Sequence, residues 1–270
     1  MFDESAAGLA NEKARGPARK RNKKEVMKVL VLSDVHGNWP ALESVLRAEP
    51  DADRIICLGD LVNYGPQPAE CVAWAMRLNP QDRVVLGNHD LAFGMETDPG
   101  CSAAYQVMAE AMKVASASLL SDEMRRFLIG LQPLQKFRWE GTNCVACHAI
   151  PTDPLYGYLM EQAGVTIWES ELVKAERPDI LFLGHTHIPM ITQFQRTLVI
   201  NPGSVGQPRD GDPQAAYVIW QDTAVSLCRV QYDVEQTVRR FEKLNLEPHI
   251  ETRLAEELRT GGRLSAATAA

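Results

Sequence analysis

Residues 26–38 of this chain read VMKVLVLSDVHGN, an apolar stretch that ends in polar residues. The stretch shows little alternation, which is typical of a strand buried on both faces. Apolar residues at helical spacing follow it, and Asn38 and Pro40 are start signals for that helix. The pattern repeats, as a strand over 54–59, a helix over 67–78 and a strand over 83–87. Strands and helices that alternate in this way predict an α/β fold around a buried parallel sheet.

The second half of the chain departs from this alternation. Residues 91–133 carry apolar side chains at helical spacing and predict a helical insertion. Further strands are predicted at 136–139, 142–149 and 179–184, with a helix over 166–176. A run of antiparallel strands is expected next, at 190–194, 197–201, 215–220 and 225–230. A helix that contains Val234 and Leu244 closes the predicted domain, which spans 26–245.

The composition is that of an ordinary globular protein. The chain has 270 residues, of which 45% are hydrophobic and 23% charged, and a formal net charge of -7. It contains no run of about 20 apolar residues, which excludes a spanning helix. The acidic balance argues against general nucleic-acid binding. Six cysteines and no signal-peptide pattern indicate reduced thiols and a cytoplasmic location.

The two ends of the chain differ from the predicted domain. Residues 1–25 are polar and then basic, with no apolar side chain larger than alanine between Lys13 and Lys24. They are predicted to form a disordered extension. A nucleic-acid or membrane-surface arm is the alternative, and Met27 is a second candidate for the start of the protein. Residues 246–270 are expected to form a C-terminal helix and a frayed tail.

Metal-type ligands follow directly after five of the predicted apolar strands. Ligands bind at the carboxyl ends of the strands in open α/β sheets, so these side chains are expected to meet at one rim. They are two aspartates, one asparagine and five histidines: Asp34, Asp60, Asn88, His36, His89, His148, His185 and His187. Two pairs among them are two positions apart and so can face the same side, Asp34 with His36 and His185 with His187.

This set of side chains favours a particular class of metal ion. Imidazole, carboxylate and amide oxygen without thiolate suit Mn, Fe, Zn, Ni or Co better than Ca. The ligands are too many for one ion, so two ions that share a bridging carboxylate are expected. Two-metal sites are suited to displacement at phosphorus. The sequence therefore predicts a dinuclear centre for phosphate ester chemistry, with Mn as the first choice.

Five sequence blocks at these strand ends resemble, in kind and in order, the calcineurin-like metallophosphoesterases. They are SDVHGN (33–38), GDLVNYG (59–65), GNHD (87–90), the single His148 and GHTH (184–187), within a match over about 27–232. The stretch NPGSVGQPRDGDP (201–213) is further similar to the YfcE-like phosphodiesterase branch. The resemblance implies a four-layer α/β/β/α sandwich of two mixed sheets with the helical insertion added to it.

Carried over by position, the resemblance assigns a role to each ligand. Asp60 would bridge the two ions, together with a water or hydroxide. Three more residues would hold each ion: Asp34, His36 and His187 for one, and Asn88, His148 and His185 for the other. His89 would be the catalytic histidine that binds no metal, and Asp90 its orienting partner. The fourth block departs from the family pattern, since Ala149 stands where relatives usually have a glycine.

The resemblance implies hydrolysis of a phosphate ester, with a phosphodiester as the first choice, by in-line attack of the metal-bridging hydroxide. His89 would give a proton or a hydrogen bond to the leaving oxygen. Phosphomonoesterase, protein phosphatase and dinucleotide polyphosphate hydrolase activities on the same site are the alternatives, as is a catalytically silent scaffold. The physiological substrate, the metal and the oligomeric state are left open by the sequence.

Three further residues are candidates for substrate binding, each with a structural alternative. Arg209 could hold a substrate phosphate as a bidentate donor or be a solvated loop residue. Tyr64 could line the cleft. Asn38 could contact substrate, although capping of the following helix also explains it. His249 lies beyond the expected core and is expected at the surface.

The stretch from Cys144 to His148 spells a C-x-x-C-H string, which also occurs at sites of haem attachment. Here the string falls on a predicted strand. Residues three positions apart on a strand point to opposite faces, so Cys144 and Cys147 cannot face one group. Both are expected to be small buried hydrophobic residues.

Overall fold

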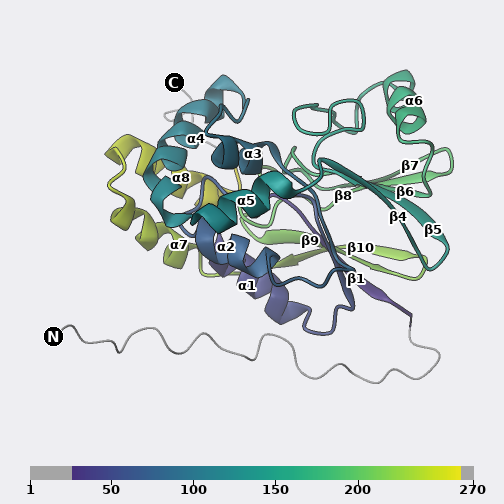
Figure 1. The fold of residues 1–270 in the computed structure, drawn as a ribbon, viewed down its shortest axis with the longest axis horizontal. Coiled ribbons are helices and arrows are strands. Elements are labelled where there is room, and N and C mark those ends of the chain that lie inside the picture. The colour runs from purple at the N-terminus through teal and green to yellow at the C-terminus, as the bar shows by residue number, and fades with distance from the viewer. Residues whose placement is uncertain (1–25, 263–270) are drawn as a thin grey trace.

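The computed structural model describes residues 26–262 and builds them around two five-stranded mixed sheets (Figure 1). The strand order in the first sheet is β10 (Ala224–Val230), β9 (Ala215–Gln221), β1 (Lys28–Leu32), β2 (Arg54–Cys57) and β3 (Arg83–Val84). The order in the second sheet is β4 (Leu134–Trp139), β5 (Thr142–Cys147), β6 (Ile180–Phe182), β8 (Thr197–Asn201) and β7 (Met190–Phe194). Each sheet has three parallel strands, β1–β2–β3 and β5–β6–β8, with antiparallel strands outside them.

The two sheets pack face to face, and this explains the apolar run Val29–Leu32 of β1. Val29 and Val31 point into the layer between the sheets, where they meet residues of the second sheet such as Phe182. Leu30 and Leu32 point the other way, toward the outer helices. Because both faces are covered, the four buried positions from Val29 to Leu32 are all apolar.

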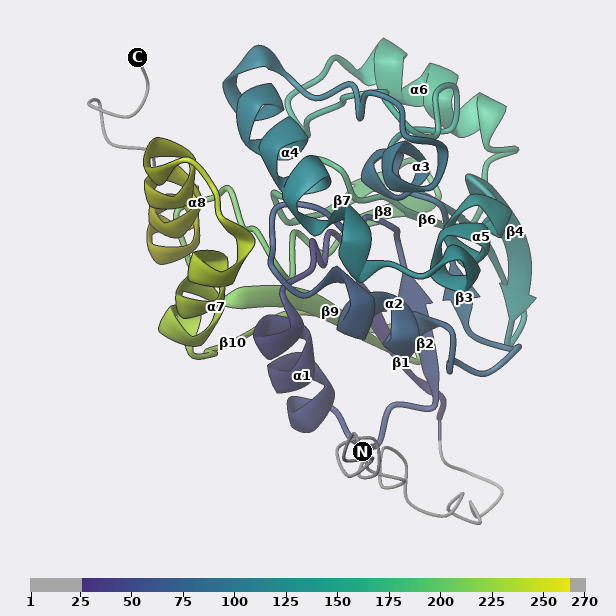
Figure 2. The same ribbon diagram turned by 60° about the vertical axis from the view of Figure 1, so that its left-hand side comes forward.

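Helices complete the sandwich on both outer faces. α1 (Trp39–Ala48) and α2 (Pro68–Ala75) cover the first sheet, and α6 (Val165–Lys174) covers the second. Trp168 of α6 is fully buried against Val145 and Leu181 of the second sheet. Figure 2 shows α1 and α6 on opposite sides of the paired sheets. The fold class expected from the sequence, a four-layer α/β/β/α sandwich of two mixed sheets, is confirmed.

A second group of helices lies beside the sandwich. α3 (Asn88–Met95), α4 (Ala103–Ser116), the 3-10 turn η1 (Ala117–Leu119) and α5 (Asp122–Gly130) form the predicted insertion, which begins at 88 rather than at 91. α7 (Val234–Phe241), the 3-10 turn η2 (Glu242–Leu244) and α8 (Pro248–Thr260) follow β10. Met108 and Met112 of α4 pack with Leu254 and Leu258 of α8, and Tyr64 joins the same cluster. This group of helices therefore reaches the loop that follows β2.

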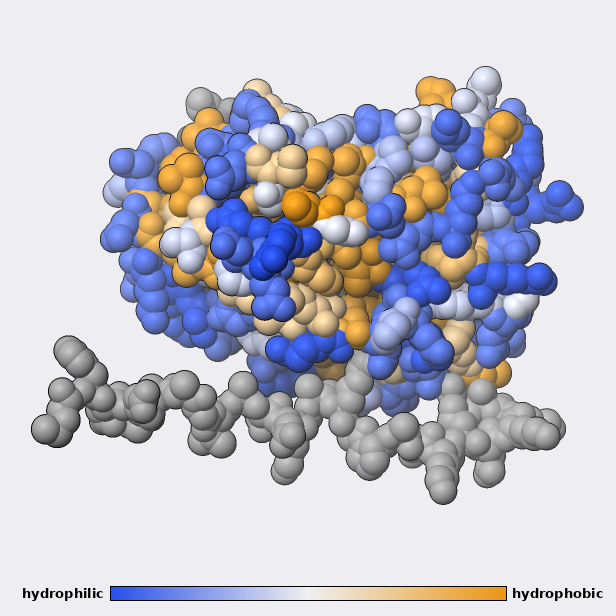
Figure 3. All heavy atoms as spheres, in the orientation of Figure 1, coloured by the Kyte–Doolittle hydropathy of each residue, from blue (hydrophilic) through white to orange (hydrophobic). Residues whose placement is uncertain are grey.

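The insertion presents a mixed polar and apolar surface. Figure 3 shows apolar side chains over the middle of the face where α3 and α5 lie in Figure 1. α5 contributes apolar surface of this kind, since Leu128 is fully buried while Ile129 is 40% exposed. Apolar atoms on a surface are ordinary in folded proteins.

The expected run of antiparallel strands over 190–230 is wrong in one respect. β7 pairs with β8, and β9 with β10, as antiparallel hairpins, but the two hairpins lie in different sheets. The chain crosses between them at 202–214, where Val205 N donates to Ser33 O at 3.0 Å. β8 then has a parallel partner in β6, whereas β9 pairs with β1. Alternation along single strands cannot show which partners they choose.

Several expectations fall at or beyond the ends of the described residues. The predictions for 1–25 and for 263–270 lie outside them. The C-terminal helix expected within 246–270 is α8, and His249 on it is exposed, as predicted. Between residues 26 and 262, no helix is both long enough and apolar enough to cross a membrane.

Candidate metal centre

The loops that leave five strands carry the expected ligands to one place. Those ligands are Asp34 and His36 after β1, Asp60 after β2, Asn88 after β3, His148 after β5, and His185 and His187 after β6. The backbone is left-handed at five of them, with φ between 48° and 67° at Asp34, His36, Asp60, His185 and His187. Residues other than glycine rarely adopt this conformation, and backbone strain of this kind is concentrated at functional sites.

The two aspartates share one arrangement, in which the backbone fixes one oxygen and leaves the other facing the centre. Asp34 Oδ2 accepts a hydrogen bond from His185 N at 3.1 Å, and Asp60 Oδ1 accepts one from His89 N at 2.9 Å. The other oxygens, Asp34 Oδ1 and Asp60 Oδ2, are buried and accept no hydrogen bond from any described residue. A buried carboxylate oxygen without a partner is costly, which is the pattern expected of an oxygen that binds a cation.

Gly87 makes room for the Asp60 carboxylate. A Cβ atom at Gly87 would overlap with Asp60 Oδ1 and with the Asp60 backbone nitrogen. The loop before α3 can therefore approach Asp60 this closely only because residue 87 has no side chain.

Three of the histidines are oriented by backbone carbonyls. The Nδ1 atoms of His36, His148 and His187 lie 3.0 Å from Val62 O, 2.7 Å from Leu58 O and 2.6 Å from Gln207 O. A carbonyl can only accept, so each Nδ1 carries the proton and each Nε2 presents a lone pair. Metal-binding histidines are typically held in this way by their second nitrogen.

The first group of ligands consists of Asp34, His36 and His187. The two Nε2 atoms are 3.1 Å apart, and Asp34 Oδ1 lies 3.3 Å from that of His187 and 3.8 Å from that of His36. Since both Nδ1 atoms are protonated, the two Nε2 lone pairs face each other. Lone pairs at this distance repel unless a proton or a cation lies between them.

The second group is arranged around His148. Its Nε2 lies 3.2 Å from Asp60 Oδ2, 2.9 Å from Asn88 Oδ1 and 3.1 Å from His185 Nδ1. The Asn88 amide is fixed because its Nδ2 donates to Pro99 O at 2.7 Å, which directs Oδ1 to the centre. The donor set is therefore one carboxylate, one amide oxygen and two imidazoles.

Asp60 lies between the two groups. Its Oδ2 is 3.2 Å from His148 Nε2 in the second group and 3.7 Å from His36 Nε2 in the first. The ligand atoms of Asp34, His36 and His187 lie within 4.8 Å of one another, as do those of Asp60, His148 and His185. Two adjacent clusters that share a carboxylate fit a pair of divalent ions.

The electrostatics favour the protonation states that metal binding needs at His36, His185, Asp34 and Asp60, whereas His148 must lose a proton when an ion binds. Burial, together with nearby His187, holds the pKa of His36 well below its usual value. Burial and neighbouring His148 lower the pKa of His185 to about 3. Although burial opposes ionisation of Asp34 and Asp60, the surrounding histidines hold both carboxyl pKa values below normal. Burial also acts to lower the pKa of His148, but the charge of Asp60 outweighs it and raises that pKa to about 9.

Comparison with known proteins agrees with this geometry. Residues 27–223 match the sequence profile of the calcineurin-like phosphoesterase superfamily domain. The chain belongs to this superfamily. It is therefore a phosphoesterase by family, as the sequence predicted.

Individual relatives cover most of the chain. The phosphoesterase is 31% identical over 248 residues to the uncharacterized protein MJ0912 of Methanocaldococcus jannaschii, which covers 84% of this chain and 96% of that protein. It is 27% identical over 212 residues to the phosphodiesterase YfcE of Escherichia coli K12, with 75% and 91% covered. A crystal structure of a metallophosphoesterase from Sphaerobacter thermophilus superimposes with a TM-score of 0.71 at 30% identity, and covers 85% of this chain and 98% of that one.

In this phosphoesterase His89 lies beside the two groups of ligands without joining either. Its backbone N donates to Asp60, while its ring contacts the edge of the His36 ring at 5.2 Å between centroids. Burial lowers the pKa of His89 to about 4 and outweighs the effect of Asp60; nearby Arg209 lowers it further. The imidazole is therefore neutral near pH 7.

The orienting partner of His89 is Asn63 rather than Asp90, so that part of the sequence-based assignment is wrong. Asn63 Nδ2 lies 2.7 Å from His89 Nδ1, and Asn63 Oδ1 accepts from Tyr64 N at 2.8 Å. Asp90 accepts instead from the backbone nitrogens of Asp60 and Leu61 at 2.8 Å and of Gly87 at 3.2 Å. It fixes the loop that carries Asp60. The sequence contained Asn63 within GDLVNYG, but spacing alone does not show which polar residue reaches the ring.

The three substrate-binding candidates lie in different environments. Tyr64 is 3% exposed, and its ring centroid lies 4.9 Å from that of His36 and 5.0 Å from that of His89. Arg209 is half-buried, with its guanidinium carbon 3.8 Å from the centroid of the Tyr105 ring. Both lie beside the centre.

Asn38, by contrast, is a structural residue, and its assignment to substrate binding is wrong. The side chain is fully buried, and both of its amide atoms are bonded within the protein. Nδ2 donates to Gly206 O and Tyr232 Oη, while Oδ1 accepts from Thr237 Oγ1 and, as the helix cap, from Ala41 N. This matches the alternative considered for it, capping of α1.

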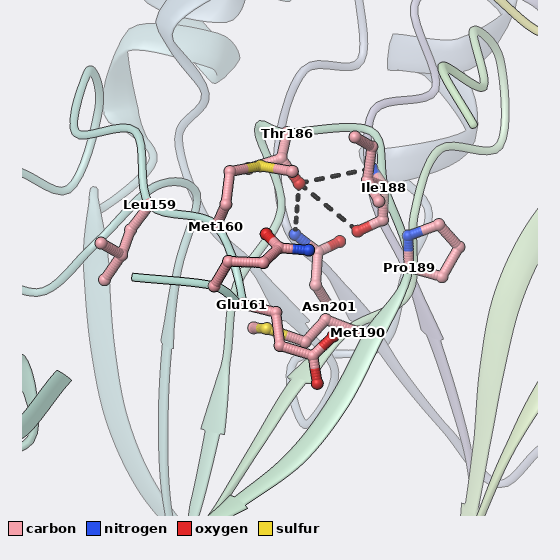
Figure 4. Close-up of a pocket in the computed structure, with 9 residues that line it drawn as sticks. Leu159, Met160, Glu161, Thr186, Ile188, Pro189, Met190 and Asn201 are labelled. Atoms are coloured by element: carbon pink, nitrogen blue, oxygen red, sulfur yellow. Dashed lines mark hydrogen bonds between the residues drawn. The ribbon is translucent and has the colours of Figure 1, made fainter. Parts of the chain in front are cut away.

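Asn201 and Thr186 support the loop that carries His185 and His187, and the sequence did not single them out. Asn201 Nδ2 donates to Gly184 O at 2.8 Å. It also donates to Thr186 Oγ1 at 3.1 Å, and Thr186 Oγ1 accepts from Ile188 N at 3.3 Å (Figure 4). A cavity of about 40 Å³ lies beside these residues. It has room for a few water molecules and not for a substrate.

The cysteines of the C-x-x-C-H string pack as predicted. Cys144 lies in the layer between the sheets and Cys147 in the layer under α6, both without a disulfide. Burial raises the pKa of the Cys144 thiol to about 12 and that of Cys147 further. Neither is suited to redox or metal chemistry.

Proposed function

We propose that this protein is a dinuclear metal-dependent phosphodiesterase. The observation that carries the proposal is the buried Oδ2 of Asp60, which has no hydrogen-bond partner in the part of the chain that the structure describes and lies between two groups of candidate ligand atoms. Asp34, His36 and His187 would hold one ion, and Asn88, His148 and His185 the other, with Asp60 shared. Nitrogen and oxygen donors without thiolate favour Mn, with Fe, Zn, Ni or Co as alternatives.

Two divalent ions, when bound, supply a water activated for in-line attack on phosphorus and positive charge to neutralise the phosphoryl oxygens. The side chains of the protein prepare the site for this chemistry. The backbone donors on Asp34 and Asp60 and the carbonyl acceptors on the three histidines fix the ligands before binding, so little reorganisation is needed.

His89 would act on the leaving oxygen. Asn63 Oδ1 accepts from the backbone, so its Nδ2 is the atom that faces His89 Nδ1 and donates to it. The proton of the neutral ring is then on Nε2, which can donate a hydrogen bond to the oxygen that leaves phosphorus. Asn63 thus sets the tautomer of His89.

Metal reconstitution tests the proposal. Protein stripped with a chelator should hydrolyse bis(p-nitrophenyl) phosphate no faster than buffer, and Mn should restore turnover together with about two ions per chain by elemental analysis. The matched control is Asp60→Asn, which should bind less metal and stay inactive under the same conditions. Full turnover by protein verified to be free of metal would refute the proposal, as would the absence of diester hydrolysis with every metal named above.

A further inference from the structure

The C-terminal helix α8 brings a buried carboxylate close to the metal centre. Glu257 is 1% exposed, and neither of its oxygens has a hydrogen-bond partner of normal geometry among the described residues. Burial raises its pKa, while a hydrogen-bonding contact with Tyr105 and the charges of Arg209 and His187 act in the opposite direction. Burying an acid without a well-formed hydrogen bond costs stability.

Arg209 lies next to the end of α8, since Gly262, whose backbone nitrogen donates to Glu257 O at 3.1 Å, packs against its Cα. Its guanidinium carbon lies 3.8 Å from the centroid of the Tyr105 ring and 5.8 Å from that of Tyr64. Its Nη2 donates to Gln207 Oε1 at 2.9 Å, and the Gln207 carbonyl accepts from His187. Its Nε is buried without a hydrogen-bond partner among residues 26–262. A guanidinium stacked on aromatic rings, with donors still unused, is suited to bind an anion.

α8 also fixes the loop on which Arg209 lies. Gly211 N donates to Gly261 O at the end of α8, at 2.7 Å. A side chain at Gly261 would collide with the backbone of Asp212, and one at Gly262 would come within 2.7 Å of the Arg209 Cα. The end of the helix and the Arg209 loop are thus in direct backbone contact, so α8 holds both Arg209 and the acid near it.

We propose that Glu257 is a specificity-determining positioning residue, which offsets the charge of Arg209 so that the site prefers singly charged phosphodiesters over doubly charged phosphomonoesters. Arg209 would contact the substrate phosphate, stacked on Tyr105, while Glu257 acts through it. The proposal rests on the phosphoesterase function proposed above and deepens it.

The preference follows from charge. The interaction of a fixed charge with a substrate scales with the charge of that substrate. A negative Glu257 therefore repels a dianion twice as strongly as a monoanion, and Arg209 alone would favour the dianion in the same proportion. Specificity of this kind comes from a repulsive element built against the competitor.

The test compares Glu257→Gln and Glu257→Ala with the wild type, all loaded with Mn. At pH 8 a phosphomonoester is doubly charged, because its second pKa is about 6. Both variants should raise kcat/KM about 3-fold for bis(p-nitrophenyl) phosphate and about 10-fold for p-nitrophenyl phosphate. The matched control is Glu251→Gln, which removes the same charge from the first turn of α8 and should change neither value. Metal content and melting temperature are measured for every variant.

Binding provides a readout that needs no turnover. Titration calorimetry with inorganic phosphate and with dimethyl phosphate should show that both Glu257 variants tighten phosphate binding by a larger factor than dimethyl phosphate binding. Equal factors for the two probes, or a monoester-to-diester ratio of kcat/KM that stays within 2-fold of the wild type, would overturn the proposal. If the wild type hydrolyses neither ester, the function proposed above fails, and the calorimetric ratio still decides the role of Glu257.

Discussion

At the scale of single residues, we expect the proposed centre to depend on Asp60 more than on any other candidate ligand. Asp60→Ala removes an atom that lies near both groups, whereas Asn88→Ala removes a neutral ligand from one. We expect Asp60→Ala to retain fewer than one ion per chain and Asn88→Ala to retain at least one, by elemental analysis of dialysed protein. Equal metal content in the two variants would contradict the bridging role.

His89 and Asn63 can be tested through the leaving group. If His89 donates a hydrogen bond to the leaving oxygen, His89→Asn should slow alkyl phosphodiesters by about 10²–10³-fold and nitrophenyl esters much less, because a nitrophenolate spreads its negative charge over the ring. Asn63→Ala should give a smaller loss of the same kind, since it only frees the ring and its tautomer. The measurement is turnover against leaving-group pKa, with metal content checked in each variant.

The control for this series is Asp90→Asn. Asp90 accepts three backbone hydrogen bonds around Asp60 and does not hold the His89 ring. Its substitution should therefore reduce metal content and slow every ester alike. A dependence on the leaving group in Asp90→Asn that matches that of His89→Asn would restore the assignment first made from the sequence.

The candidate ligands could be predicted because their residue types bind metals and because each of them follows an apolar strand. Ligands such as Asp34 and His187 follow apolar strands, and the carboxyl ends of parallel strands meet. Their supporting residues could not be predicted in the same way. Asn63, Asn201 and Glu257 act through contacts with residues far away in the chain, and their types alone are ordinary for loops and helices.

At the scale of elements, β5 allows a prediction about the thiols. Cys144 and Cys147 face different apolar layers and touch no ligand atom. The double variant Cys144→Ala with Cys147→Ala should keep its metal content and its turnover within about 2-fold. Its melting temperature should fall by a few degrees, because each change leaves a small cavity. Loss of metal, or covalently bound haem in the wild type, would show that the C-x-x-C-H string has a chemical role.

The strands themselves could be predicted from their apolar runs, but not their partners. β8 and β9 both have apolar sequences, yet β8 joins the second sheet and β9 joins the first. The choice is made by the crossing segment 202–214, which packs against the loop after β1. Such long-range pairing depends on the whole core. The spacing of apolar residues predicted the helices of the insertion, but it could not predict that α8 packs on α4.

At the scale of the whole molecule, the candidate ligands of the proposed metal centre come from both sheets. Asp34, His36, Asp60 and Asn88 come from the ends of the first sheet, and His148, His185 and His187 from those of the second. Hydrogen bonds already join the loops of the two sheets. His148 Nδ1 donates to Leu58 O, and His185 N donates to Asp34 Oδ2. Two cations would add bonds between the sheets that the unfolded chain lacks.

Metal removal should therefore lower the stability of the fold as well as abolish activity. A ligand that binds only the folded state at about 1,000 times its Kd stabilises it by about 4 kcal/mol. For a domain of this size, that corresponds to a fall of roughly 8–16 °C in melting temperature on chelation. Asp60→Ala, which lacks the shared ligand, should melt at nearly the same temperature with and without chelator, whereas Glu251→Gln should respond like the wild type. An unchanged melting temperature in wild-type protein verified to have lost its metal would mean that the ions do not link the sheets. The hydrogen bonds from His148 to Leu58 O and from His185 N to Asp34 would then hold the sheets together without metal.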